Sequence, residues 1–179
     1  MTATPTPRSE PWLRGPVPDI LPELQAAAHA LLNVKEELSA ATKDLTSHEL
    51  WLTPGGAASI GFHIRHIAGS LDRLLTYARG KQLSAEQRGA LATERDVTLA
   101  PNDIPSLLRH AESAIDTALA QLRQTRADEL FVARSVGRAA LPSNVFGLLS
   151  HAAEHAARHA GQAVTTAKIV RGMGYTRRA

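Results

Sequence analysis

The sequence predicts an all-α protein, a four-helix bundle that follows an extended N-terminal arm. Apolar side chains recur at intervals of three and four residues along four separate segments, as in amphipathic helices that bury one face. No series of segments shows the strict alternation of sheet strands. The 179 residues, 44% of them hydrophobic and 21% charged, fit one globular domain that can bury a sizeable core.

The first third of the chain is expected to contain the arm, one long helix and a short helical turn. Five prolines and few apolar side chains predict that residues 1–18 are extended. Residues 22–41 carry the apolar stripe of a first helix. Thr46 and Glu49 have the spacing of a capping box, which predicts a short helical turn before the Pro-Gly-Gly break at residues 54–56.

The middle of the chain is expected to form two further helices. Apolar side chains alternate by four and three over residues 58–78, and Gly80 should end this second helix. Residues 81–101 are interpreted as a connection. Asn102 or Asp103 can cap a third helix, which the same rhythm extends to about position 123.

The last third is expected to form a fourth helix after an irregular segment. Residues 130–138 are short and interrupted by arginine, so they are interpreted as extended or loop. Ser143 or Asn144 can cap the fourth helix, which should end near Gly172. The bundle domain is therefore expected over residues 19–172, followed by a basic tail at residues 173–179.

Composition narrows the classes of function. The 20 Lys and Arg residues and the 17 Asp and Glu residues are interspersed, so the net charge of +3 does not indicate nucleic-acid binding. No apolar run approaches the ~18 residues of a membrane span, and the N-terminus lacks the apolar segment of a secretory signal. We therefore expect a soluble, cytoplasmic protein without a membrane partner. Because the chain has no cysteine, a metal must bind to His, Asp or Glu, and thiol chemistry would need a small-molecule thiol.

Three histidines, His151, His155 and His159, recur every fourth residue in the stretch HAAEHAARHAGQ. This spacing places three imidazoles on one face of the fourth helix. Histidine is the commonest metal ligand of proteins, and two imidazoles one helical turn apart can hold one ion. Metal binding is the first hypothesis that this pattern suggests.

The apolar rhythm of the fourth helix places His155 and His159 on its expected inward seam. Unpaired imidazoles there would each cost about 1 to 3 kcal/mol, which favours ligands over solvated or singly hydrogen-bonded histidines. His151 lies about 60° from Leu148, at the edge of the stripe, and is the weaker candidate. The expected seam consists of Leu148, Ala152, His155, His159, Gln162, Thr166 and Ile169.

A third ligand is expected from the helix over residues 58–78, which offers His63 and His66. Periodicity favours His63, which lies about 60° from Ile60, against about 120° for His66. A bundle helix touches two neighbours, so either edge can point inward. Spacing alone leaves both residues open.

Two segments together, PGGAASIGFHIRHIAGSLDRLL and LLSHAAEHAARHAGQ, resemble the DinB/YfiT-like family of metal-dependent enzymes. The resemblance implies a DinB-like bundle of up-down-down-up topology, often dimeric, with one divalent ion on three histidines. In the family register, the ligand on the second helix follows Ile60 by six residues, at His66. The paired ligands precede a Gly-Gln, which places them at His155 and His159. Ala160 stands where many members carry Arg, which leaves the ligands unchanged.

Three neutral imidazoles leave a zinc or nickel ion with an open position, as in catalytic sites. Such an ion can lower the pKa of a bound water to about 7 or hold a thiol as its thiolate. Characterised relatives include transferases and isomerases that use low-molecular-weight thiols, so the resemblance implies a thiol-dependent transferase or isomerase acting on a small molecule, with a second copy of the chain as partner. The alternatives are a metal-dependent hydrolase that uses metal-bound hydroxide and a non-catalytic metal-binding stress-response bundle.

Two further groups of polar residues are weaker candidates. Glu154 could act as a base beside His155, but its spacing to Arg158 makes an exposed ion pair at least as favourable. Asp72 and Arg73 could orient a substrate, although ordinary surface charge is the favoured interpretation.

Overall fold

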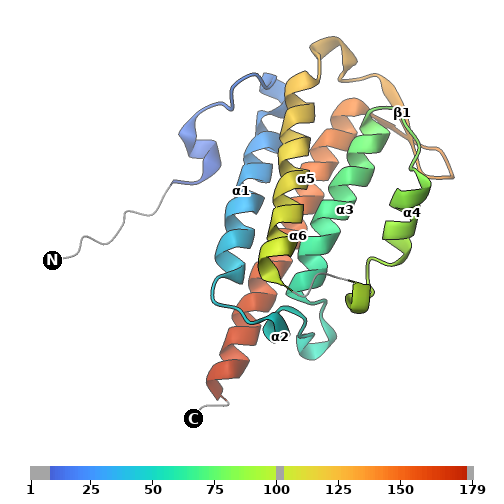
Figure 1. The fold of residues 1–179 in the computed structure, drawn as a ribbon. Coiled ribbons are helices and arrows are strands. Elements are labelled where there is room, and N and C mark those ends of the chain that lie inside the picture. Colours follow the sequence, from blue (N-terminus) through green and yellow to red (C-terminus); the bar gives the residue numbers. More distant parts are fainter. Residues whose placement is uncertain (1–8, 100–102, 177–179) are drawn as a thin grey trace.

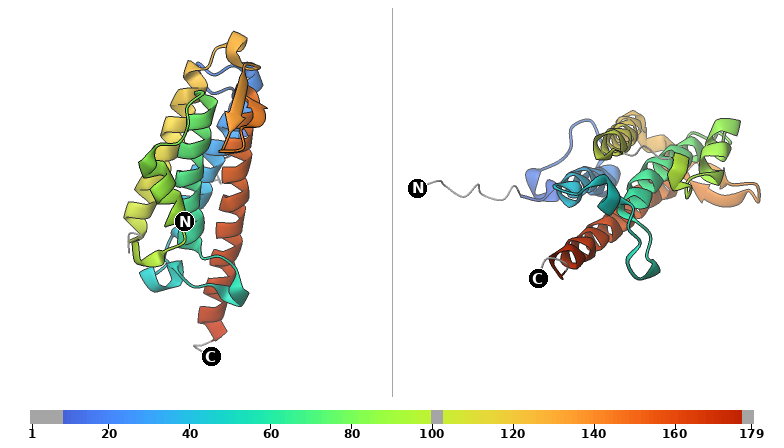
Figure 2. Two further views of the ribbon diagram at one scale, coloured as in Figure 1. Left: turned by 90° about the vertical axis from the view of Figure 1, so that its right-hand side faces the viewer. Right: turned by 60° about the horizontal axis from the view of Figure 1, so that its bottom comes forward.

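The computed structural model describes residues 9–99 and 103–176, and within these ranges four long helices lie side by side (Figure 1). They are α1 (Gln25–Thr42), α3 (Ile60–Ala78), α5 (Ile104–Gln124) and α6 (Val145–Thr176). Both α5 and α6 pack against α1 and α3. In Figure 1, the chain runs downward through α1 and α6 and upward through α3 and α5. The C-terminal end of α6 extends below the other helices, as Figure 2 also shows. The predicted all-α fold is confirmed.

Shorter elements connect the long helices. A helical turn, α2 (Ser47–Leu50), precedes α3, and α4 (Ala85–Ala92) follows it. The strands β1 (Ala133–Val136) and β2 (Leu141–Asn144) pair as an antiparallel hairpin before α6. Short 3-10 helices span Pro11–Arg14, Pro22–Leu24, Pro54–Gly56, Val97–Leu99 and Ala127–Glu129.

Two predictions about the secondary structure need correction. Residues 81–101 are not only a connection, because Ser84 and Gln87 form a capping box that begins α4. This helix buries none of its residues, so it lacks the apolar stripe from which the long helices are predicted. The last helix also continues beyond Gly172, to Thr176.

The predicted caps are found at the starts of α2, α5 and α6, and Ser59 is an additional cap at the start of α3. Thr46 and Glu49 form a reciprocal capping box at α2. Ser59 accepts a hydrogen bond from the backbone of Phe62 at the start of α3, and Asp103 caps α5 in the same way. The side chain of Asn144 accepts a hydrogen bond from Gly147 N at 2.7 Å, which selects Asn144 over Ser143 as the cap of α6.

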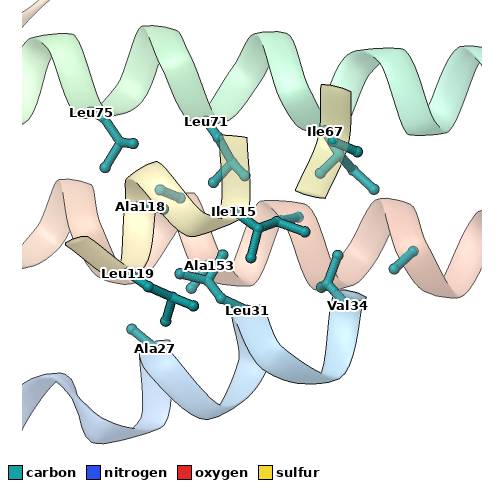
Figure 3. Packing of buried hydrophobic residues seen from close by; sticks show 14 of the residues in the cluster. Ala27, Leu31, Val34, Ile67, Leu71, Leu75, Ile115, Ala118, Leu119 and Ala153 are labelled. Atoms are coloured by element: carbon teal, nitrogen blue, oxygen red, sulfur yellow. The ribbon is translucent and has the colours of Figure 1, made fainter. Parts of the chain in front are cut away.

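The core lies between the four long helices and is formed by aliphatic side chains (Figure 3). The contribution of α6 differs from the expected seam, because Gln162 and Ile169 are exposed. Leu148, Ala152 and Thr166 of that seam are buried, but beyond Ala152 the buried face of α6 consists mainly of alanines, so this part of the helix packs through small side chains. Buried members of the core include Leu31, Val34, Ile67, Leu71, Leu75, Ile115, Leu119, Ala153, Ala156, Ala160, Ala163 and Ala167.

The part of the N-terminal arm that the structure describes, residues 9–18, is anchored to α1. Arg14 forms a bidentate ion pair with Glu36, and the side chain of Gln25 hydrogen-bonds to the backbone of Val17. His29 Nε2 lies 3.0 Å from Gly15 O. The remaining arm residues, 1–8, and residues 177–179 of the expected tail lie outside the described residues. Within the described ranges, no helix is both long and apolar enough to cross a membrane.

The start of α3 fits closely against Trp51. A Cβ at Gly61 would lie 2.6 Å from two atoms of the Trp51 ring, whereas a Cβ at Gly89 in α4 would meet nothing within 4 Å. Gly61→Ala should therefore lower the free energy of unfolding by about 1 to 3 kcal/mol through overpacking. Gly89→Ala should raise it by up to about 1 kcal/mol, because alanine is the better helix former. Urea denaturation of both variants tests these expectations. An equal increase in the free energy of unfolding in Gly61→Ala and Gly89→Ala would contradict the close fit of Gly61 against Trp51.

Candidate metal centre

Histidines from α3 and α6 meet where these two helices pack against each other. Each of His66, His155 and His159 offers one ring nitrogen, and these three atoms lie within 4.8 Å of one another. His66 Nε2 lies 2.9 Å from His155 Nε2. All three side chains are half-buried. The group can hold a metal ion, and it consists of the same three histidines that the resemblance to the DinB/YfiT-like family implies.

Small residues on α6 explain why these imidazoles meet. The neighbouring positions Ala156 and Ala160 are fully buried, so α6 approaches the core closely at this point. His155 and His159 flank that alanine face. They therefore do not lie in the centre of the buried face, where the expected seam places them, but reach from its edge toward α3.

His63 lies beside the group rather than within it. Its side chain is only 5% exposed, and its Nδ1 lies 2.9 Å from His159 Nδ1. One of these two nitrogens donates the hydrogen and the other accepts it. Because this contact uses Nδ1 of His159, the other ring nitrogen, Nε2, stays available to bind a metal ion. Periodicity thus favoured the more buried of the two histidines on α3, whereas the three-histidine group contains the other one.

Glu94 lies on the far side of His66. His66 Nδ1 donates a hydrogen bond of 2.7 Å to Glu94 Oε2, and Arg73 Nη1 donates one of 2.9 Å to Glu94 Oε1. Arg73 is therefore the buried ion-pair partner of Glu94, and its interpretation as ordinary surface charge is wrong. Sequence reasoning missed Glu94 because it follows α4 in the presumed connection. The capping-box spacing of Ser84 and Gln87 was the available signal that this segment is ordered.

Burial sets the charge states around the group. Together with the neighbouring imidazoles, it lowers the pKa of His159 to about 4 and also lowers the pKa of His155. The pKa of His63 falls for the same reasons. Burial alone would raise the pKa of Glu94, but the hydrogen bonds from His66 and Arg73 outweigh it and lower that pKa overall. The cluster therefore combines neutral imidazoles, the form that binds metal, with an ionised carboxylate.

The family follows from a comparison with known proteins. The sequence profile of the DinB superfamily matches residues 30–163. The chain belongs to the DinB superfamily. Its fold is similar to that of a conserved protein from Enterococcus faecalis, with a TM-score of 0.69 and 18% identity over 83% of this chain and 97% of that one. No curated protein matches the chain.

His151 of this DinB-superfamily chain lies outside the three-histidine group. It is exposed, and its Nδ1 lies 3.4 Å from Glu154 Oε2. Glu154 also accepts a hydrogen bond of 3.0 Å from Arg158 Nε. The carboxylate that could have served as a base is therefore held in an exposed ion pair.

His151→Ala should retain near-stoichiometric metal, because the three grouped nitrogens belong to other residues. Residues at i and i+8 of a helix are about 12 Å apart along its axis, which leaves His151 out of reach of an ion held with His159. Elemental analysis of the purified variant tests this expectation. Loss of the metal would favour a site built on His151 and His155.

Proposed function

We propose that this DinB-superfamily protein is a metal-dependent enzyme in which His66, His155 and His159 bind one divalent ion. The convergence of three ring nitrogens within 4.8 Å carries this proposal. Two imidazole nitrogens bound to tetrahedral zinc through bonds of about 2.05 Å lie about 3.3 Å apart. The separation of 2.9 Å between His66 Nε2 and His155 Nε2 is close to this value, so the residues present fit such an ion.

The ligand set favours zinc or nickel and an open coordination position. Imidazole suits both metals, and three protein ligands with one vacant position are typical of catalytic zinc sites. The three ligands are neutral, so they leave the charge of the ion uncompensated and favour an anion at the vacant position. When bound, the ion would stabilise a small-molecule thiol as its thiolate, ready to attack an electrophile.

We favour a thiol-dependent transferase or isomerase over a hydrolase because both carboxylates beside the ligands are engaged. Glu94 is bonded to His66 and Arg73, and Glu154 is paired with Arg158. A carboxylate free to take a proton from a metal-bound water would favour a hydrolase. Held in these pairs, neither carboxylate is a ready general base.

A groove next to the histidines offers space for a substrate. It has a volume of about 550 Å³ and lies between α6 and the start of α3. His63, which contacts His159, lines it from α3, and Arg158, whose guanidinium also pairs with Glu154, lines it from α6. Ile169 and Ala57 make another part of the wall apolar. These features suit an elongated small molecule that carries an anionic group near the metal ligands.

The test is elemental analysis of protein purified without an affinity tag or added metal, followed by a screen of electrophiles with candidate thiols. We expect about one zinc or nickel ion per chain and turnover that requires both the metal and a thiol. Turnover with water alone would favour the hydrolase. Stoichiometric metal without any turnover would favour the non-catalytic bundle.

A further inference from the structure

The turn that follows α4, residues 93–96, docks on a second face of α3, away from the main core stripe. Arg65 Nη1 donates a hydrogen bond of 2.7 Å to Asp96 O. The guanidinium of Arg95 lies 5.1 Å from the centroid of the Phe62 ring. Phe62, His66, Gly69 and Arg73 of α3 face the turn and are spaced by four, three and four positions, so they form one stripe, which Arg65 flanks.

A glycine makes room for the carboxylate that this turn carries. A Cβ at Gly69 would lie 2.4 Å from Glu94 Oε1 and 2.8 Å from Arg73 Nη1. Gly69 therefore lets the ion pair lie directly against the backbone of α3. As a result Glu94 is 7% exposed although it belongs to a loop.

Both oxygens of Glu94 are occupied in this position. Oε2 accepts from His66 Nδ1 at 2.7 Å and from Arg73 Nη2 at 3.3 Å, and Oε1 accepts from Arg73 Nη1 at 2.9 Å. An ionised carboxylate can only accept hydrogen bonds. The hydrogen of a neutral His66 must therefore lie on Nδ1, which leaves the lone pair on Nε2.

We propose that Glu94, held by Arg73, is a positioning residue that fixes His66 as the Nδ1–H tautomer with Nε2 directed at the metal. This inference rests on the proposed metal function. The three ligands are then unequal, because the outer nitrogen of His159 meets neutral His63, whereas that of His66 meets a charge. A carboxylate partner orients the ring and increases the basicity of the ligating nitrogen. Of the three proposed ligands, His66 is therefore the one whose ring a carboxylate orients and makes more basic.

The sharpest variant is Glu94→Gln, which keeps the shape of the side chain. Arg73 only donates hydrogen bonds, so it should hold the amide oxygen and turn the amide nitrogen toward His66 Nδ1. The amide would then donate to Nδ1 and favour the tautomer with hydrogen on Nε2, the nitrogen needed for the ion. The matched control is Glu154→Gln, which alters an exposed carboxylate next to His155.

Nitrogen-15 NMR of the metal-free protein at neutral pH reports the His66 tautomer without any activity measurement. We expect Nδ1–H in the wild type and in Glu154→Gln, and a shift to Nε2–H in Glu94→Gln. Chelator competition should show zinc binding that is about 10- to 100-fold weaker in Glu94→Gln and unchanged in the control. Glu94→Ala, which has no side-chain acceptor, should also lose the Nδ1–H preference.

The outcomes separate this inference from the proposed function. If Glu94→Gln kept the wild-type tautomer and bound zinc as tightly as the wild type, the positioning role of Glu94 would be wrong while the metal site stood. If the wild type bound no zinc, the proposed function would fail. The tautomer of His66 in Glu94→Gln would then still decide whether Glu94 orients this ring.

Discussion

His155→Ala should lower the zinc or nickel content of the purified protein by about tenfold or more, because it removes one of the three proposed ligands. His66→Ala and His159→Ala should have the same effect, since each contributes one nitrogen to the group. Two remaining imidazoles give too few bonds for a stable site. Elemental analysis of tag-free protein, with circular dichroism to check the helical fold, measures the loss.

Two other histidines serve as controls for this experiment. His48 lies exposed on α2, so His48→Ala should keep its metal. His63→Ala removes a neighbour of His159 but none of the three nitrogens of the His66, His155 and His159 group. The His63→Ala protein should therefore lose less metal than the His66→Ala protein. Full occupancy in His66→Ala together with loss in His63→Ala would show that periodicity, not the family register, identifies the ligand on α3.

The long helices could be predicted because their signals are local. Apolar repeats over three to six turns and capping residues such as Asp103 and Asn144 determine where each helix begins. The hairpin of β1 and β2 could not be predicted in the same way. Its strands have only four residues each, and the apolar side chain of Leu141 is exposed. The hairpin therefore lacks the alternation of buried apolar and exposed polar residues from which a strand is predicted.

The face of α6 shows a limit of periodicity. Alanine is small and common on both faces of this helix, so several stripes fit the sequence equally well. The chosen stripe included His155 and His159 but also the exposed Gln162 and Ile169. The true buried face is shifted toward the alanines, and packing against neighbouring helices, not the sequence of α6, determines this shift.

The histidines on α6 could be found from their spacing, but their partners depend on tertiary structure. His63 and His66 lie on the same helix, and only the way α3 and α6 pack brings His66 to His155. Glu94 is separated from His66 by 28 positions, and the path of the intervening segment decides its contact. Local patterns carry no information about such a path.

Acid should destabilise the metal-free protein because its clustered histidines resist protonation. The pKa of His159 is lowered to about 4, and those of His63 and His155 are also lowered. In the unfolded chain these rings return to an ordinary pKa of about 6.5. As the pH falls below about 6.5, the unfolded state therefore takes up protons that the folded state does not, and the stability that neutral rings provide is lost progressively.

Urea denaturation in the presence of a chelator, between about pH 7 and pH 5, should show a falling free energy of unfolding. The slope is at most about 1.4 kcal/mol per pH unit for each proton taken up, and it is reduced here because the rings are only partly buried. Carboxylates with lowered pKa values titrate below this interval, so histidines dominate it. His159→Gln should show a shallower slope than the wild type. Parallel curves for the two proteins over this interval would contradict the predicted neutral cluster.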